Sequence, residues 1–259
     1  MESNYLNPSL TDLETVKLIK EKIESNTPFA LTRFGDGEIY ILNRNASEHF
    51  LKKNLNEWGY NYPSQINEFY DDANTILKRS IVLSDVIGLM NPNCVIAKHI
   101  NYKSSVWSLK KEDIVSFGGD ISKLKICNHM ISRSEIMGSL QGFKNIIQGK
   151  SFHIISRNTN EMKNRKLEDL FNVKITYTHH PNNINFNNRE DFISGFKDIK
   201  EDIVIMGVGL QKDYGIILRD NYGKIALDMG ATMDAWSGII SRPWFNNGNL
   251  QDYLILKNN

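Results

Sequence analysis

The sequence has little of what marks several common protein classes. It contains two cysteines, Cys94 and Cys127, and no CxxC pair, so we expect buried free thiols and neither a disulfide framework nor a cysteine-based zinc or redox site. No run of 18 apolar residues occurs, and Met1 to Leu13 has no apolar core of a signal peptide, so we expect no membrane span and no secretion. The net charge is only +1, which gives no basis for an electrostatic grip on nucleic acid.

What is present is typical of a folded globular protein. Hydrophobic residues make up 41% of the 259 residues and charged residues 24%, with no fixed-period repeat. The length fits one large domain or two small ones. We interpret residues 1–259 as a single cytoplasmic domain, with an irregular segment at about 43–80 as a candidate insert on the acceptor side, and the Asn-rich stretch 182–188 as a surface loop.

Apolar periodicity predicts an α/β fold. Apolar residues recur at helical spacing from Thr11, a candidate N-cap, to Glu24, and Phe29 to Arg33 reads as a buried strand. Further strands are expected at 81–84, 114–117, 152–155, 173–177, 203–206 and 224–228. Helical patterns lie at about 131–140, 159–170, 189–199 and 211–220. Strands that alternate with helices indicate a Rossmann-like, mostly parallel sheet with flanking helices.

Ligands of such folds bind at the carboxyl ends of the strands, so the loops that follow the expected strands are the first places to search. These loops are 33–38, 84–85, 156–158, 207–209 and 228–230. Three of the five carry a carboxylate and two carry an arginine, Arg33 or Arg157. Because this mixture suits an anionic ligand held by cations and a metal ion, we expect a phosphorylated ligand.

The loop Arg33-Phe34-Gly35-Asp36-Gly37-Glu38 carries the most specific pattern. Mn²⁺ and Mg²⁺ prefer oxygen ligands and share them with substrate phosphates, so Asp36 and Glu38 could hold a metal ion that bridges to a diphosphate. Gly35 and Gly37 would let the backbone approach the ligand closely. The alternative for Asp-Gly-Glu alone is a solvated turn, and Arg33 at the end of an apolar strand weighs against that alternative.

Two segments near the carboxyl end offer weaker patterns. Gly207-Val208-Gly209 follows a strand and precedes a helix, but Lys212 stands where a dinucleotide fingerprint needs a third glycine, so a tight turn and a nucleotide contact remain equal interpretations. Asp228 and Asp234 could supply a general base, with Trp236 as a platform for a sugar ring, although a helix cap is the simpler interpretation of a strand-terminal aspartate.

Other motifs of known chemistry are missing from the sequence. The histidines, at positions 99, 129, 153, 179 and 180 among others, show no zinc-binding spacing, and no GxSxG elbow or P-loop occurs. The sequence therefore gives little support for a zinc enzyme, an acyl-transfer hydrolase or a P-loop kinase. Arg133 could contact a phosphate, although an exposed helical arginine is the commoner explanation.

Two of these segments together resemble a known family. Residues 32–38 resemble the Arg-Phe-Gly-Asp-Gly-Glu signature of GT-D fold glycosyltransferases, and residues 207–209 with 226–230 resemble that family's C-terminal pattern. The resemblance covers about 10–240 and implies a Rossmann-like nucleotide-sugar transferase in which Asp36 and Glu38 bind Mn²⁺ or Mg²⁺ and the donor diphosphate. Such enzymes build bacterial surface polysaccharides or glycosylate adhesins. This chain departs from the family at Leu210-Gln211-Lys212 and at 231–234, which leaves the donor sugar and the base open.

We therefore expect a metal-dependent glycosyltransferase of the hexosyltransferase type. The donor would be a nucleotide-diphosphate sugar, with a UDP-sugar favoured, and the acceptor a glycan, a lipid-linked oligosaccharide or a glycoprotein. Arg33 and the metal would stabilise charge on the leaving phosphate. An inverting reaction would use Asp234, Asp228 or Asp85 as base, whereas a retaining one needs none. A metal-dependent phosphoesterase and a non-catalytic nucleotide- or glycan-binding module are the alternatives. A lipid-linked acceptor would bring the protein to the inner face of the membrane, although the sequence shows no amphipathic basic segment.

Overall fold

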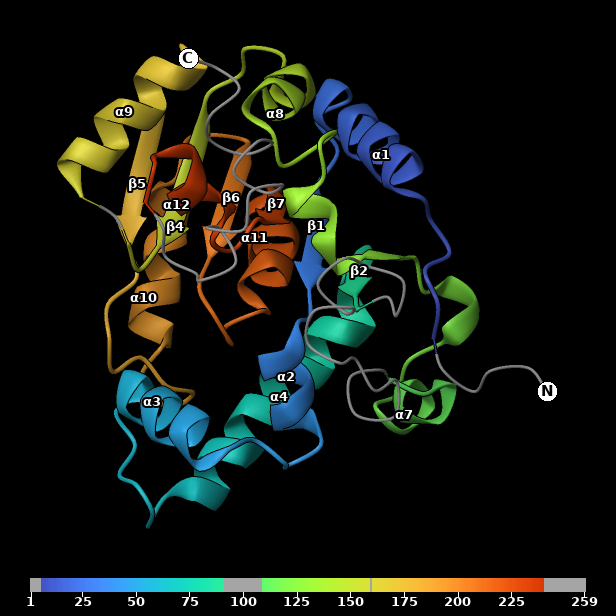
Figure 1. The fold of residues 1–259 in the computed structure, drawn as a ribbon, viewed down its shortest axis with the longest axis vertical. Coiled ribbons are helices and arrows are strands. Elements are labelled where there is room, and N and C mark those ends of the chain that lie inside the picture. The colour runs from blue at the N-terminus through green and yellow to red at the C-terminus, as the bar shows by residue number, and fades with distance from the viewer. Residues whose placement is uncertain (1–5, 91–108, 159, 240–259) are drawn as a thin grey trace.

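The computed structural model describes residues 6–90, 109–158 and 160–239, and all statements on the structure refer to these. They form a seven-stranded sheet of order β3-β2-β1-β7-β6-β4-β5 in which every pair of neighbours is parallel (Figure 1). The strands are β1 (Phe29–Arg33), β2 (Val86–Leu89), β3 (Ile126–Asn128), β4 (Phe152–Ser156), β5 (Ile175–His179), β6 (Ile203–Gly207) and β7 (Ile225–Asp228). The expected α/β class with a parallel sheet is confirmed.

Helices cover both faces of this sheet. The α-helices are α1 (Asp12–Glu24), α2 (Asp36–Leu42), α3 (Glu48–Trp58), α4 (Ile66–Leu83), α7 (Lys111–Ser116), α8 (Leu140–Ile147), α9 (Glu161–Phe171), α10 (Glu190–Ser194), α11 (Tyr214–Tyr222) and α12 (Thr232–Trp236). The 3-10 helices are η1 (Ile121–Lys123), η2 (His129–Arg133) and η3 (Gly195–Asp198). In Figure 1, α1, α8 and α9 lie along one side of the strands, and α3 and α4 lie on the other.

The alternation of side chains along the strands explains these two layers. In β1, Leu31 packs into the core beneath α1, α8, α9 and α12, together with Leu227 of the neighbouring strand β7 and Ile205 of β6, the next strand along. Val204 and Ala226 point to the opposite face and pack beneath α10 and α11. Strands that are apolar on both faces are what a parallel sheet covered by helices requires.

The first helix begins where the sequence predicts. Thr11 accepts a hydrogen bond from the backbone of Glu14, and the Glu14 carboxylate accepts one from the backbone of Thr11, which is a complete capping box. The buried residues Val16, Ile19 and Ile23 form the face that packs on the sheet. The predicted strands at 29–33, 152–155, 203–206 and 224–228 are also observed, within a residue or two of their expected ends.

The strand expected at 81–84 is wrong, because these residues belong to the end of α4 or follow it. Leu77 and Ile81 are buried at helical spacing, so the apolar run continues the inner face of an 18-residue helix. The strand begins instead at Val86, which places Asp85 at the amino end of β2. There its Oδ2 atom accepts hydrogen bonds from Ala30 N at 2.8 Å and Arg219 Nη1 at 2.9 Å. Asp85 therefore lies at the edge of the sheet opposite the expected ligand site.

Residues 114–117 are also not a strand. They lie within or next to α7, where Ile114 is buried and Val115 is 61% exposed. The strand in this region is β3, which is only three residues long and gave no recognisable pattern. The helix expected at about 131–140 is instead the 3-10 helix η2 followed by turns, and α8 begins at Leu140 after its N-cap Ser139. Cys127 in β3 is a buried free thiol, as expected, whereas Cys94 lies outside the described residues.

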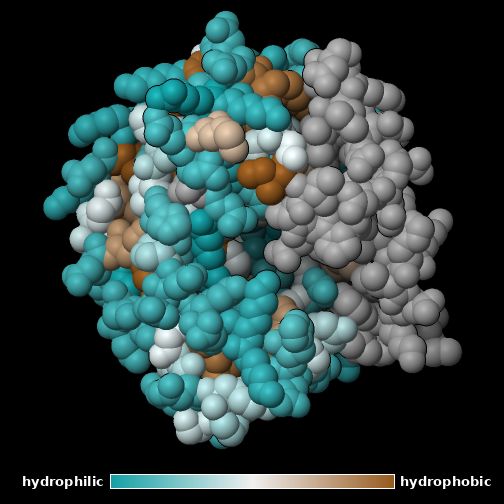
Figure 2. Space-filling view, turned by 60° about the vertical axis from the view of Figure 1, so that its left-hand side comes forward, coloured by the Kyte–Doolittle hydropathy of each residue, from teal (hydrophilic) through white to brown (hydrophobic). Residues whose placement is uncertain are grey.

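The segment at 43–80 forms α3 and most of α4, which pack with α2 around an apolar cluster that includes Trp58 and Phe69. These rings meet edge to face, with centroids 5.3 Å apart. None of the helices within the described ranges combines the length and the hydropathy needed to cross a bilayer. The face of the molecule drawn in Figure 2 is mostly hydrophilic where it is coloured, with hydrophobic side chains in small separate groups.

Candidate active site

The strand order places a topological switch point at the carboxyl ends of β1 and β7, and we call the region between the loops that follow these two strands the crevice. These strands are neighbours, but the chain leaves β1 for α2, whose buried residues pack with α4, and leaves β7 for α12, whose buried residues pack on the opposite face of the sheet. A crevice between two loops that depart to opposite faces is where open α/β sheets bind ligands. The charged residues of the first expected loop gather there with residues from the loops after β3, β6 and β7.

Arg33 and Asp228 form the floor of this crevice. Arg33 donates from Nε to the backbone oxygen of Asp228 at 2.6 Å and from Nη1 to the backbone oxygen of His129 at 2.9 Å. The backbone N–H of Arg33 also donates to Asp228 Oδ2 at 3.2 Å. The side chains of Arg33 and Asp228 are only 7% and 5% exposed. The guanidinium is therefore fixed in place by two strands and by η2.

Gly230 leaves the space that this guanidinium occupies. A Cβ atom at Gly230 would lie 2.4 Å from Arg33 Nη2, and the residue has a φ of +55°, a conformation that favours glycine. Close packing against Arg33 therefore explains the glycine of the Asp-Met-Gly segment at the end of β7.

The acid-x-acid pair lies in the first turn of α2 and not in an irregular loop as expected. Glu38 Oε2 accepts a hydrogen bond from Gly35 N at 2.9 Å, so Glu38 caps the helix that carries it. Asp36 is exposed at the rim of the crevice. Partial loss of hydration raises the pKa of Asp36, the Glu38 carboxylate raises it further, and Arg133 of η2 opposes the rise. The turn thus concentrates negative charge at the mouth of the crevice.

Lys212, in the loop between β6 and α11, is a site residue that the sequence analysis missed. Its Nζ atom lies 2.7 Å from Asp228 Oδ2 and 3.1 Å from Glu38 Oε1. Burial alone would lower the pKa of Lys212, but these two carboxylates outweigh it and the pKa is raised. Burial alone would likewise raise the pKa of Asp228, but Lys212 and Arg33 outweigh it and the pKa lies below its usual value. Both groups are therefore charged at neutral pH.

His129 and Arg133 enter from η2, directly after β3. The ring of His129 is 7% exposed, and within the described part of the chain its Nδ1 atom has no hydrogen-bond partner. Burial lowers the pKa of His129 well below its usual value, and the cations Arg133, Arg33 and Lys212 lower it further. The imidazole is therefore neutral at pH 7. Arg133 is half-buried and close enough to Asp36 to lower its pKa, so it is not the isolated, exposed helical arginine of the simpler interpretation.

A divalent metal ion at this site would depend on few protein ligands. In the described ranges, no group of three or more His, Cys, Asp or Glu side chains is arranged to hold a metal ion. Asp36 and Glu38 nevertheless offer the carboxylate oxygens that Mn²⁺ and Mg²⁺ prefer, and these ions commonly complete their coordination with water and substrate phosphates. The repulsion between the two carboxylates, which raises the pKa of Asp36, is what a bound cation would relieve. The donor set fits an ion shared with a diphosphate.

Asp234 and Trp236 lie in α12, on the other side of the crevice. Asp234 is 4% exposed and is held by Lys163 Nζ of α9 and by Asn158 Nδ2 at 3.2 Å. The interpretation of Trp236 as a platform for a sugar is wrong, because its ring packs in the core against Phe143, with centroids 4.9 Å apart, and its Nε1 donates to the Gly138 carbonyl.

The remaining predicted ligand residues are placed as follows. Arg157, after β4, pairs with Glu57 of α3, which links the sheet to that helix. A Cβ atom at Gly37 would lie 2.8 Å from the ring of Phe50, so this glycine serves close packing and is buried. A Cβ at Gly207 would lie 3.0 Å from the Gly230 carbonyl, which shows that the loops after β6 and β7 pack directly together.

Gly35 and Gly209 are less enclosed by protein atoms. A Cβ at Gly35 would meet Glu38 Oε2 at 3.4 Å, an ordinary contact distance. Gly209 has a φ of +62°, and a Cβ built there would have no heavy atom of the described residues within 4 Å apart from its chain neighbours. These two glycines keep the backbone of the crevice accessible.

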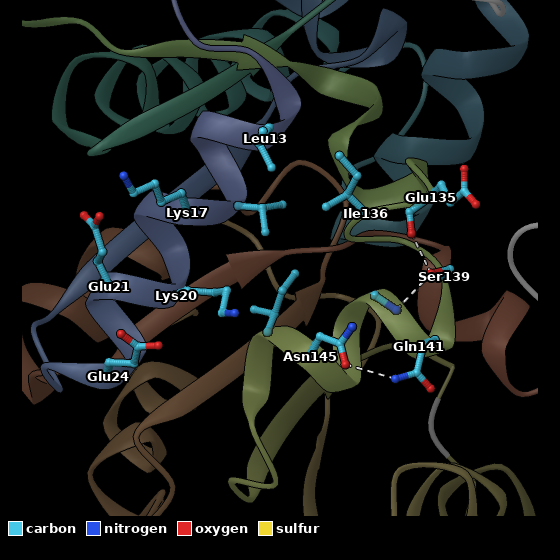
Figure 3. A pocket seen from close by; sticks show the side chains of 13 residues that line it. Leu13, Lys17, Lys20, Glu21, Glu24, Glu135, Ile136, Ser139, Gln141 and Asn145 are labelled. Atoms are coloured by element: carbon cyan, nitrogen blue, oxygen red, sulfur yellow. Dashed lines mark hydrogen bonds between the residues drawn. The ribbon is translucent and has the colours of Figure 1, made fainter.

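The structure also contains a cavity of about 800 Å³ between α1 and α8 (Figure 3). Leu13 of α1 and Ile136, which precedes α8, line it with Lys17, Lys20 and Glu135, as Figure 3 shows. None of the predicted site residues is among the residues that line this cavity. The cavity is therefore separate from the charged crevice.

Comparisons with known proteins agree with this fold. A family model described as a GT-D fold-like domain matches residues 10–236. A selenomethionine-substituted structure of domain of unknown function 1792 is 17% identical, with a TM-score of 0.60, and the match covers 95% of this chain and 89% of that one.

Two further solved structures are similar. One, described as domain of unknown function 1792 with a distinct glycosyltransferase fold, is 16% identical with a TM-score of 0.57, over 92% of this chain and 81% of that one. The other, described as a new glycosyltransferase (DUF1792) from Streptococcus sanguinis, is 14% identical with a TM-score of 0.56, over 93% and 91%. These likenesses establish the fold. A search of curated proteins finds no match.

Proposed function

We propose, from the premise that the chain belongs to the GT-D-like family, that it is a glycosyltransferase that uses a nucleotide-diphosphate sugar as donor. We favour a UDP-sugar, and as acceptor a glycan, a lipid-linked oligosaccharide or a glycoprotein, as in polysaccharide biosynthesis. The observation that carries the proposal is the crevice at β1 and β7. It brings Arg33 and the acid pair of α2 together at the edge where α/β folds bind phosphorylated ligands.

The chemistry of the donor explains why this arrangement is useful. When the glycosidic bond to the diphosphate breaks, negative charge grows on the phosphate oxygens of the leaving group. A guanidinium already fixed at the crevice floor can stabilise that charge without reorganisation, so Arg33 would lower the barrier more than it strengthens ground-state binding. Mn²⁺ or Mg²⁺, held by Asp36 and Glu38, would supply further positive charge to the same oxygens.

The proposed roles of Asp228 and Asp234 differ. Asp228 is held by Arg33 and Lys212, and its pKa is lowered, so it is a weak base that is better suited to positioning these two cations. Asp234 remains our proposed base for an inverting reaction, although it would first have to loosen its pairing with Lys163. Asp234→Asn should then reduce kcat about a hundredfold or more with little change in donor affinity, because general-base catalysis typically contributes that much. Unchanged kcat would favour a retaining reaction.

The proposal is tested by calorimetric titration with UDP and with UDP-sugars in the presence of Mn²⁺ and again with chelator. The variants Asp36→Asn and Glu38→Gln should weaken metal-dependent binding at least about tenfold, since each removes a charged metal ligand. Asp198→Asn changes an exposed aspartate of η3 and serves as the control. Binding that does not depend on metal and is the same in all variants would refute the role of the acid pair.

Turnover assays separate the remaining alternatives. A glycosyltransferase should hydrolyse its donor slowly and transfer the sugar when an acceptor extract is added. Release of phosphate from simple esters without any acceptor would favour a phosphoesterase. Tight donor binding with neither hydrolysis nor transfer would favour a binding module.

A further inference from the structure

The backbone of Lys212 is anchored through both of its neighbours in the chain. Its two neighbours in the chain, Gln211 and Asp213, are both fully buried. Arg189 donates to Asp213 Oδ1 and Oδ2 at 2.9 and 2.6 Å and to Gln211 Oε1 at 3.2 Å, and Gln211 Nε2 donates to the Ile184 carbonyl at 3.1 Å. Because both neighbours are anchored, the backbone of Lys212 has little freedom, and its side chain is directed to the crevice.

The ammonium group of Lys212 connects two loops that come from distant parts of the sequence. It donates to Asp228 at the end of β7 and lies within ion-pair distance of Glu38 in the first turn of α2. An ammonium has three N–H donors, so these two carboxylates leave one donor for a ligand oxygen. The side chain is 9% exposed, and the Glu38 side chain is 14% exposed, which places the pair where a ligand can reach it.

The formal charges of the crevice balance one another in the absence of a ligand. Arg33, Lys212 and Arg133 face Asp36, Glu38 and Asp228, and the neutral His129 adds no charge. Asp228 already has Arg33 as a buried partner, so the carboxylate that depends on Lys212 for its charge balance is that of Glu38. Burying an additional lysine costs desolvation free energy, and apolar side chains usually fill such a position at lower cost. A ligand that takes up the charge of Lys212 explains its presence.

On the basis of the proposed function, we infer that Lys212 binds a phosphate oxygen of the donor and serves as the counter-ion of Glu38 until the donor is bound. In the donor-free protein the ammonium pairs with Glu38, one of the two proposed metal ligands. A donor diphosphate offers the ammonium a new partner, and Glu38 is then released to face a cation. Lys212 would thereby couple diphosphate binding to the availability of the acid pair.

The first test compares ligands that differ only in their phosphates. Lys212→Met should weaken UDP binding about tenfold to a hundredfold in calorimetric titrations with chelator, because it removes one charge-assisted hydrogen bond, and uridine binding should not change. Lys212→Arg should restore most of the UDP affinity. Lys224→Met is the matched control, since Lys224 is equally buried but precedes β7 at the opposite edge of the sheet. Equal losses for UDP and uridine, or no loss for UDP, would overturn the inference.

The second test does not depend on the nucleotide. Inorganic pyrophosphate should bind the wild-type protein at least about tenfold more tightly than Lys212→Met. If the wild-type protein binds pyrophosphate in this way but binds no UDP, the proposed donor is wrong and the role of Lys212 stands. If it binds UDP and Lys212→Met binds pyrophosphate equally well, the glycosyltransferase proposal stands and the role of Lys212 is refuted. If the wild-type protein binds neither ligand, both proposals are refuted.

The third test addresses the counter-ion role directly. In the absence of any donor, Mn²⁺ should bind Lys212→Met at least about tenfold more tightly than the wild-type protein, because removal of the ammonium leaves the carboxylates with less compensating charge. Titration followed by electron paramagnetic resonance of free Mn²⁺ measures this without any enzyme assay. The double variant Lys212→Met with Asp228→Asn removes both charges of the buried pair and provides a folded alternative if the single variant is unstable. Equal Mn²⁺ affinities in wild-type and variant proteins would contradict the counter-ion role.

Discussion

Replacement of Gly230 by alanine tests the construction of the crevice floor. The added Cβ would lie 2.4 Å from Arg33 Nη2, and the backbone would keep a φ of +55°. The left-handed conformation alone should cost about 1–2 kcal/mol for alanine. Relief of the overlap requires the guanidinium to move, which weakens its hydrogen bonds to the carbonyls of Asp228 and His129, and such a bond from a charged group contributes about 1.5–3 kcal/mol. We therefore expect Gly230→Ala to lose about 3–4 kcal/mol in total.

The control for this prediction is Gly149→Ala. Gly149 has a φ of +75°, and among the residues that the structure describes a Cβ built there meets no atom within 4 Å beyond its chain neighbours, so its replacement should show only the conformational cost of about 1–2 kcal/mol. Denaturant unfolding followed by circular dichroism measures both variants, and UDP titration then measures the donor site. Only Gly230→Ala should also lose UDP affinity, since only this variant displaces Arg33. Equal losses of stability in the two variants, with UDP binding intact in both, would refute the proposed contact.

Three further predictions concern charge and pH. Asp213→Ala should destabilise the protein by about 3–5 kcal/mol in denaturant unfolding, because it leaves Arg189 buried without its carboxylate; a loss below about 1 kcal/mol would contradict the importance of this pair. Burial lowers the pKa of His153 from 6.5 to about 4, so only the unfolded chain takes up this proton between these pH values. Stability should fall as the pH drops through that window, by at most about 3 kcal/mol from this group, and His153→Gln should reduce the slope. The raised pKa of Asp36 means that its ionisation disfavours the folded state as pH rises. Asp36→Asn should therefore raise the free energy of unfolding of the metal-free protein at pH 7, by less than about 1 kcal/mol, and leave it unchanged at pH 3, below the usual pKa of aspartate; the Tm measured at both pH values checks this.

The sequence predicts best those elements whose apolar pattern has a single structural explanation. The run at 203–206 becomes the inner strand β6, buried on both faces, and Thr11 caps α1 as its position before the apolar helical pattern predicts. The run at 81–84 fails because an apolar segment at the end of an amphipathic helix has the composition of a strand. Its two interpretations differ only in which neighbours bury it, and that is a property of the whole fold.

The site residues that lie in one continuous motif could be predicted from the sequence. Those that only the fold brings together from distant segments could not. The acid pair and Arg33 lie within six residues and could be found together. In the sequence, Lys212 was noted only as a departure from the expected glycine and family patterns. Its partners Glu38 and Asp228 lie in distant parts of the sequence, so no local motif indicates the contact. His129 lacked any metal-binding spacing, and its link to the site is a backbone carbonyl, which no side-chain pattern can reveal.

The pairing of Arg33 with Asp228 joins positions 195 residues apart. A polypeptide emerging from the ribosome cannot complete the crevice floor until β7 has been made and inserted between β1 and β6. Contacts of such long range carry a large loop-closure entropy and are associated with slow folding. Ligand-binding competence should therefore be among the last properties that a refolding sample regains, after most of its helical signal has returned.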